Sequence, residues 1–199
     1  MATFEEITRH SDDDADAVVW VGGPPAPEVI AVVDPDPAWP ASYEVLAERI
    51  RAALGDRVLD LEHVGSTSVP GLAAKPIIDI DLTVADSGDE ASYVAALEAA
   101  GFALRIREPN WHEHRCLQSV DPRSNLHVWS PDSPEAIRHR MFRDWLRTHP
   151  EDLALYAETK RTSADESNAA NEVVMAYNKR KEPVIRDILD RMFRANGML

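Results

Sequence analysis

The chain has a single cysteine, Cys116, in 199 residues. A disulfide needs two cysteines and an all-cysteine zinc site needs four, so both an internal disulfide framework and such a zinc site are excluded. A protein without disulfides suits a reducing compartment, and we expect a cytoplasmic location. Because Cys116 lies between Arg115 and Leu117 with no reactive partner nearby in sequence, we expect it to pack in the interior.

Positive charge is also scarce, with 21 Lys and Arg against 35 Asp and Glu and a formal net charge of −14. Binding to DNA or RNA gains affinity from a basic surface that releases counterions, so a nucleic-acid partner is not expected. Two local basic segments, 138–143 and 179–181, favour an anionic small molecule instead.

Long apolar runs are missing as well. No segment approaches the roughly 20 apolar residues that span a bilayer, and the first residues have neither the basic nor the apolar part of a signal peptide. We therefore expect neither membrane insertion nor secretion. The composition predicts nothing about the oligomeric state.

The length and the 44% hydrophobic content suit one domain. We divide it into an acidic extension over residues 1–28, a core over 29–130 and a helical part over 131–199 packed on that core. The extension has acidic residues followed by Gly22-Gly23-Pro24-Pro25, a composition that predicts mobility. Its short apolar piece, Val18 to Val21, is suited to joining a sheet edge. The acidic residues are Asp12, Asp13, Asp14 and Asp16.

Residue patterns predict strands followed by helices. The final helix contains Pro183, which should bend or divide it. This order predicts an α/β (α+β) fold, a mixed sheet with flanking helices and a helical C-terminal part. The predicted strands are 29–33, 58–64, 77–84, 102–107, 115–119 and 126–129, and the predicted helices are 40–54, 90–100, 134–147, 151–167 and 170–195.

Two carboxylates stand out on the predicted strand 77–84. Its period of two places Asp79 and Asp81 on one face, with their backbones about 7 Å apart. Two carboxylates at that distance can share one or two metal ions, and Mg²⁺ or Mn²⁺ is the expected cofactor. The alternative is that they belong to a solvated face of the strand.

A second feature precedes these carboxylates. The strand 58–64 ends in Gly65-Ser66, followed by Thr67, and successive backbone N–H groups at such a turn can hold phosphate oxygens. Gly-Ser alone is a weak signal. Its value comes from its position, about a dozen residues before the Asp79-Ile80-Asp81 strand.

Residues 62–80 read EHVGSTSVPGLAAKPIIDI, which closely resembles the core motif of the GrpB-like family. The resemblance extends over about residues 29–193. It includes 36–40, 125–129, 138–139, 142–144 and 149–151, together with Tyr156, Lys160, Tyr177 and Lys181.

That resemblance implies a nucleotidyltransferase superfamily fold, in which Gly-Ser holds the β- and γ-phosphates of a nucleoside triphosphate and carboxylates hold magnesium. A GrpB-like domain is also fused to dephospho-CoA kinase in some bacteria. Active nucleotidyltransferases usually add a third carboxylate from a later strand, but 125–129 has no acid. His127 in that strand is a candidate metal ligand, general base or phosphate contact. Glu62 or Glu113 is a candidate for the third carboxylate.

Other residues are candidates for phosphate contacts, each against the alternative of an ordinary surface or helix-face position. These are Lys75, Arg115, Arg138, Arg143, Tyr177 and Lys181.

The leading hypothesis is a metal-dependent nucleotidyltransferase-like enzyme with catalytic residues Asp79, Asp81 and His127, acting on a nucleoside triphosphate and a small-molecule acceptor. One alternative is a non-catalytic module that binds a nucleotide or a coenzyme A precursor. Another is a different metal-assisted transferase or ligase of specialised metabolism. The three differ in whether the ligand is turned over and in the product.

Overall fold

The computed structural model describes residues 1–10 and 18–199. Its described strands form one six-stranded sheet in the order β1-β4-β5-β6-β3-β2. Only β3 and β6 pair in parallel, and the other neighbours are antiparallel, which confirms the predicted mixed sheet. The strands are β1 (Val19–Trp20), β2 (Asp60–Val64), β3 (Ile78–Thr83), β4 (Ala103–Glu108), β5 (His114–Val120) and β6 (Arg123–Trp129).

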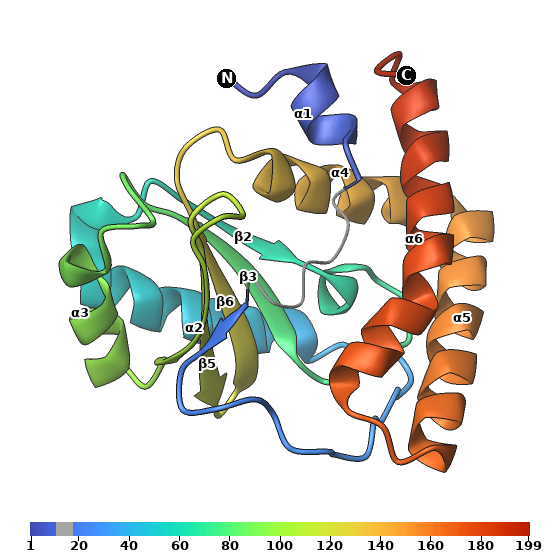
Figure 1. Cartoon of the computed structure of the whole chain (residues 1–199), viewed down its shortest axis with the longest axis horizontal. Coiled ribbons are helices and arrows are strands. Elements are labelled where there is room, and N and C mark those ends of the chain that lie inside the picture. The colour runs from blue at the N-terminus through green and yellow to red at the C-terminus, as the bar shows by residue number, and fades with distance from the viewer. Residues whose placement is uncertain (11–17) are drawn as a thin grey trace.

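The helices lie on both faces of this sheet (Figure 1). One face is covered by α2 (Trp39–Leu54) and α3 (Val94–Ala99). The other side of the molecule holds α4 (Pro134–Thr148), α5 (Pro150–Ala169) and α6 (Val174–Ala195). A short 3-10 turn, Glu90–Ser92, precedes α3, so the helix predicted over 90–100 is shorter than expected.

Strand β3 separates an apolar core from a polar face, as its period of two predicts. Ile78, Ile80 and Leu82 are buried in the core shared with α2 and α3. The alternate residues Asp79 and Asp81 face the side of α4, α5 and α6. The register with β6 sets Asn125 beside Asp79 and His127 beside Asp81. The polar face therefore continues across two central strands.

The C-terminal helices pack on the link that follows β2. Val69 and Leu72 of this link form a second core with Leu146 of α4, Tyr156 of α5 and Ile188 of α6. Helix α6 runs through Pro183 as one element, so the predicted division at this proline is not observed.

The first residues are more ordered than the composition predicts. Helix α1 (Phe4–Thr8) has a capping box, in which Thr3 Oγ1 accepts from the Glu6 backbone and the Glu6 carboxylate accepts from Thr3 N–H. Ile7 is buried against Leu189, Met192 and Phe193 of α6. The acidic residues Asp12, Asp13, Asp14 and Asp16, for which the composition predicts mobility, lie outside the described residues.

Two predictions about strand pairing near the start of the chain had opposite outcomes. Val19–Trp20 pairs with β4 at the edge of the sheet, which confirms the prediction for Val18 to Val21. The strand predicted over 29–33 is wrong, because only Val33 makes an isolated bridge, to Ala74. The amide of Asn168 in α5 replaces a partner strand: Asn168 Oδ1 accepts from Ile30 N at 2.8 Å, and Asn168 Nδ2 donates to Ile30 O at 3.0 Å.

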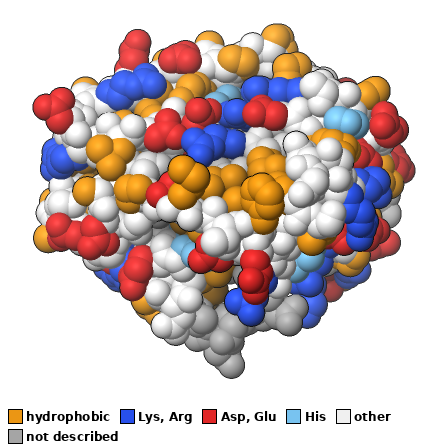
Figure 2. Space-filling model, turned by 90° about the horizontal axis from the view of Figure 1, so that it is seen from above, with side chains coloured by type: hydrophobic (Ala, Val, Ile, Leu, Met, Phe, Trp, Pro, Cys, Tyr) orange, Lys and Arg blue, Asp and Glu red, His pale blue; other side chains and the backbone are white. Residues whose placement is uncertain are grey.

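The surface mixes charges of both signs. On the face in Figure 2, acidic and basic side chains lie interspersed with hydrophobic ones. Of the helices in residues 1–10 and 18–199, none is long and apolar enough to cross a membrane.

Candidate functional site

A cavity of about 300 Å³ lies where the polar face of the sheet meets α5 and α6. It brings together seven of the residues predicted from sequence: Gly65, Ser66, Lys75, Asp79, His127, Tyr177 and Lys181. These residues come from the turn after β2, the strands β3 and β6, and helix α6. The other lining residues are Val64, Ala74, Ile77, Asn125, His139, Tyr156, Lys160 and Asn178.

The Gly65-Ser66 turn depends on glycine. Gly65 has φ 65° and ψ −169°, a conformation that side chains disfavour, and a Cβ at this position would lie 2.4 Å from Asp79 Oδ2. Residues Ser66–Ser68 then form one 3-10 turn, in which Ser68 Oγ donates to Gly65 O at 2.6 Å. The backbone of the turn is thereby held directly against the Asp79 carboxylate.

Asp79 is half-buried at the floor of the cavity. Its Oδ1 accepts a hydrogen bond from Asn125 Nδ2 at 2.8 Å and lies 3.9 Å from His127 Nε2. Burial would raise the pKa of Asp79, but the neighbouring His127, the hydrogen bond from Asn125 and the charge of Lys75 outweigh it, so the pKa is lowered. Asp79 is therefore a carboxylate that faces the cavity.

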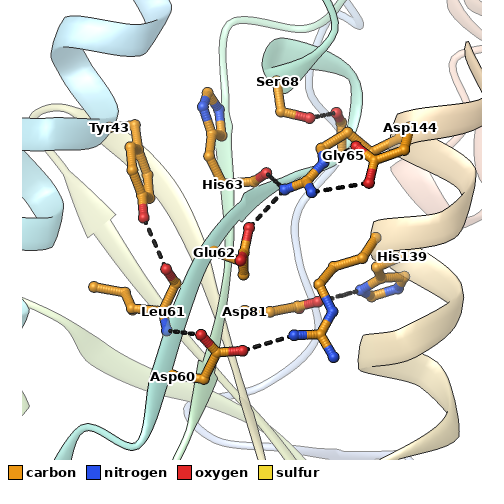
Figure 3. Close-up of polar contacts among 12 residues, drawn as sticks. Tyr43, Asp60, Leu61, Glu62, His63, Gly65, Ser68, Asp81, His139 and Asp144 are labelled. Atoms are coloured by element: carbon orange, nitrogen blue, oxygen red, sulfur yellow. Dashed lines mark hydrogen bonds and ion pairs between the residues drawn. The ribbon is translucent and has the colours of Figure 1, made fainter. Parts of the chain in front are cut away.

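Asp81 is engaged inside the protein and does not line the cavity. Only 4% exposed, it accepts from Trp129 Nε1 at 2.9 Å. It also accepts from His139 Nδ1 at 3.0 Å (Figure 3). Burial would lower the pKa of His139, but attraction to Asp81 raises it to about 9. The charge on Asp81 is thus compensated by a histidinium, which occupies the place beside the carboxylate that a metal ion would need.

The residues as arranged do not fit a metal site built from both carboxylates. Asp81 has both oxygens directed at protein donors, whereas Mg²⁺ needs free oxygen ligands in octahedral geometry. Within the described part of the chain, no group of three or more His, Cys, Asp or Glu side chains could hold a metal ion. The predicted use of Mg²⁺ or Mn²⁺ stays a prediction from sequence.

Three lysines converge on the same cavity from different elements. Lys75 follows the Gly-Ser turn, Lys160 lies on α5, and Lys181 lies on α6. The Nζ atoms of Lys75 and Lys181 lie 5.4 Å and 4.0 Å from the centroid of the Tyr177 ring. Lys160 Nζ lies 5.1 Å from the ring centroid of Tyr156. A cation over an aromatic face is attracted by the ring quadrupole. Tyr177 therefore favours the charged forms of Lys75 and Lys181, and Tyr156 favours that of Lys160.

Burial and mutual repulsion disfavour the charged forms of the lysine cluster formed by Lys75, Lys160 and Lys181, so a negatively charged group nearby would stabilise it. Lys160 is 2% exposed, and its Nζ has no hydrogen-bond partner. Burial, and then the charge of Lys181, lower the pKa of Lys160 to about 6, and burial with the charge of Lys75 lowers that of Lys181 to about 7. The Tyr177 hydroxyl is also buried without a partner. Buried polar groups are nearly always hydrogen-bonded, so these atoms indicate a site for an anionic ligand.

Lys160 and Tyr156 are the site residues that reasoning about chemistry from sequence missed, although the family resemblance included both. A signal was present: Tyr156 and Lys160 repeat the spacing of Tyr177 and Lys181, with Tyr and Lys one helical turn apart. The same spacing on two adjacent helices directs both pairs to one cavity. Asn125, His139 and Asn178 also line it, and for Asn178 the sequence contains no comparable signal.

Arg115 and Arg138 lie outside the cavity. Arg115 is on β5, which is separated from β3 by β6. Because side chains alternate along a strand, Arg115 lies on the opposite face of the sheet, where it donates to Glu90 at 2.6 Å. Arg138 Nε donates to the backbone oxygen of Ile7 at 3.0 Å, so it anchors α1.

Thr67 and Arg143 do not line the cavity. They stabilise the Gly-Ser turn through contacts with the strand that precedes it. Thr67 Oγ1 is within 3.0 Å of His63 Nε2. Arg143 donates to Glu62 at 2.7 Å and to His63 O at 2.9 Å (Figure 3). Glu62 faces Asp81 in the register of β2 and β3, but this ion pair occupies its carboxylate. Glu113, the other candidate third carboxylate, contacts Arg115 at the β4–β5 hairpin.

The sequence was compared with known families and proteins. The family model described as GrpB protein matches residues 29–191. A UPF0157 protein of Halalkalibacterium halodurans is 47% identical over 162 residues, which cover 81% of this chain and 82% of that protein. The crystal structure of a conserved protein GrpB from Enterococcus faecalis aligns with a TM-score of 0.66 and 26% identity, over 82% of this chain and 99% of that one.

A further similarity is to part of a larger protein. A dephospho-CoA kinase of Mycolicibacterium paratuberculosis is 31% identical over 189 residues, which cover 81% of this chain but 46% of the kinase. The match therefore leaves more than half of that longer protein without a counterpart here.

Proposed function

The chain belongs to the GrpB family, and from that premise we propose that its cavity binds the phosphate groups of a nucleotide or of a coenzyme A precursor. The lysine cluster of Lys75, Lys160 and Lys181 supplies the positive charge. Gly65 and Ser66, which line the same cavity, supply backbone N–H groups and a hydroxyl.

The observation that carries this proposal is the buried amino group of Lys160, which has no hydrogen-bond partner and lies beside Lys181. Burial and the repulsion between protonated lysines lower the pKa of Lys160 to about 6 and that of Lys181 to about 7. A phosphate group with its acceptor oxygens relieves that repulsion and supplies the missing hydrogen bonds, each worth about 1.5–3 kcal/mol when charged groups are paired.

The size and charge of the cavity favour a small ligand over a polymer. About 300 Å³ is at the lower end of the range for small-molecule sites. The formal net charge of −14 disfavours nucleic acid, since a polyanion would approach an acidic surface. The similarity to dephospho-CoA kinases, proteins named for a coenzyme A precursor, supports including that class of ligand.

A second candidate is metal-dependent nucleotidyl transfer to a small-molecule acceptor. It is favoured by Asp79 and Asp81 on one face of β3, directly after the Gly65-Ser66 turn. This function requires Asp81 to release His139 before it can hold Mg²⁺ or Mn²⁺. Binding without metal requires no such rearrangement, and for that reason we rank phosphate binding first.

Calorimetric titration separates these functions. The purified protein is titrated with ATP, GTP, CTP, UTP and dephospho-CoA, with Mg²⁺ and with EDTA. Three variants accompany it: Lys160→Met, the control Lys179→Met at an exposed position of α6, and the double variant Asp79→Asn/Asp81→Asn. Products of long incubations with candidate hydroxyl and amine acceptors are identified by mass.

Binding in EDTA that Lys160→Met weakens by about tenfold or more and Lys179→Met preserves supports the phosphate site. Binding only with Mg²⁺ that the double Asp variant loses, with a product heavier by a nucleotidyl group, supports the second candidate instead. If none of the five ligands binds under either condition, the proposed function is rejected.

A further inference from the structure

A line of hydrogen bonds runs from the β4–β5 hairpin into the cavity. At its outer end, His114 Nδ1 lies 2.6 Å from Glu108 Oε2. His114 Nε2 lies 3.1 Å from His127 Nδ1, and His127 lines the cavity. The sheet register fixes this line, because Glu108 pairs with His114 across β4 and β5, and Cys116 pairs with His127 across β5 and β6.

The order of donors and acceptors along this line follows from its outer end. Burial raises the pKa of Glu108. In its ionised form this carboxylate only accepts hydrogen bonds, so His114 Nδ1 carries the hydrogen that is donated to it. Burial, reinforced by the charge of His139, lowers the pKa of His114 well below its ordinary value, so the ring is neutral. Its Nε2 is therefore an acceptor, and His127 Nδ1 must be the donor.

The same order leaves a free acceptor in the cavity. In the Nδ1–H tautomer, His127 has a lone pair on Nε2, which lies 3.9 Å from Asp79 Oδ1. That distance is too long for a hydrogen bond. Two acceptors facing each other across a gap are satisfied by a donor placed between them, which an O–H or N–H group of a ligand provides.

Packing keeps the two rings in this orientation. His114 is 4% exposed and stacks on Trp129 with ring centroids 4.3 Å apart. Trp111 meets the edge of His114 with ring centroids 5.3 Å apart. The ring of His114 stacks on that of His127 with centroids 5.2 Å apart and planes inclined by 21°. A ring held on its faces cannot turn to exchange its nitrogens without disturbing the neighbouring aromatic side chains.

We propose that Glu108 and His114 are positioning residues that hold His127 in the Nδ1–H form, so that His127 Nε2 accepts a proton from a hydroxyl or amine of the bound ligand. In that step the O–H bond of the hydroxyl, or one N–H bond of the protonated amine, breaks and its electron pair stays on the oxygen or nitrogen. The proton binds Nε2, and the ring becomes an imidazolium beside the Asp79 carboxylate. The ligand class is thus an alcohol or amine next to a phosphate group, which deepens and rests on the proposed function.

The tautomer is measured directly on protein labelled with ¹⁵N-histidine, by long-range ¹H–¹⁵N correlation without any ligand. The His127 signals are assigned from their loss in His127→Gln. We expect wild-type His127 and His114 both to carry hydrogen on Nδ1. In Glu108→Leu and in His114→Phe, which keeps an aromatic ring at position 114, we expect His127 to become a mixture of the two tautomers. Glu113→Gln, a charge loss on the same hairpin outside the line, should leave His127 unchanged.

The inference is overturned if wild-type His127 carries its hydrogen on Nε2, or if Glu108→Leu and His114→Phe, both folded by circular dichroism, leave its tautomer as in the wild type. Its failure is distinguishable from that of the proposed function. If nucleotides do not bind while the tautomers follow the expectation, the assignment of the line stands and the ligand assignment falls.

Discussion

The Asp79 carboxylate occupies the space that a side chain at Gly65 would need. A Cβ on Gly65 would lie 2.4 Å from Asp79 Oδ2 and 2.8 Å from Asp79 Cβ. The Gly65-Ser66 turn and β3 are therefore in direct contact, and the shape of one depends on the position of the other.

Gly65→Ala tests that contact. The positive φ and the collision with Asp79 should together lower the free energy of unfolding by about 2–5 kcal/mol. Gly71→Ala is a matched control, because Gly71 also has a positive φ of 81° but its Cβ would meet nothing within 4 Å. Its expected cost is about 1–2 kcal/mol. Urea denaturation measures both, and equal losses would contradict the close contact.

Lys160→Met separates binding from stability. The substitution removes a buried, unpartnered ammonium and keeps an unbranched apolar side chain, so stability should be unchanged or higher. Nucleotide affinity should fall by about tenfold or more, since one charged hydrogen bond is worth about 1.5–3 kcal/mol. Thermal unfolding and calorimetry measure the two effects, with Lys179→Met as the exposed control. A loss of stability together with unchanged affinity would show that Lys160 serves only the fold.

Ligand binding should take up protons at neutral pH. Lys160 and Lys181 have pKa values lowered to about 6 and about 7, so both are partly neutral at pH 7.5. An anion beside them raises those pKa values and draws protons from the buffer. The number of protons comes from the binding enthalpy in buffers of different ionisation enthalpy. Lys160→Met should reduce this uptake, and equal uptake in both proteins would contradict the role of Lys160.

His139→Gln tests whether His139 compensates the negative charge of Asp81. The variant leaves Asp81 with the Trp129 donor and a neutral amide, and the cost should be about 1–3 kcal/mol. The pKa of His139 is raised from 6.5 to about 9, so the stabilisation is complete below pH 6.5 and is lost as the pH rises through about 9. Urea denaturation from pH 5.5 to 9.5 should show the difference between wild type and variant shrinking over that window. A difference that grows with pH would contradict the ion pair.

The sequence alone was sufficient for the order of most elements and for the acidic strand. The alternation of Ile78, Asp79, Ile80 and Asp81 has one physical solution, a central strand with an apolar face and a polar face. Local chemistry of this kind acts over neighbouring residues, which explains why most of the predicted strands and helices are present. The strand predicted over 29–33 failed because its partner is the side chain of Asn168, far along the chain.

Only the tertiary structure decided which charged residues share a site. Asp79 and Asp81 look equivalent in sequence, but Asp79 faces the cavity and Asp81 is held by Trp129 and His139. Similarly, the approach of α5 to α6 is what sets Lys160 beside Lys181, and the register of β4, β5 and β6 is what aligns Glu108 with His127 through His114. These groupings depend on contacts between distant segments, which residue spacing along the chain does not determine.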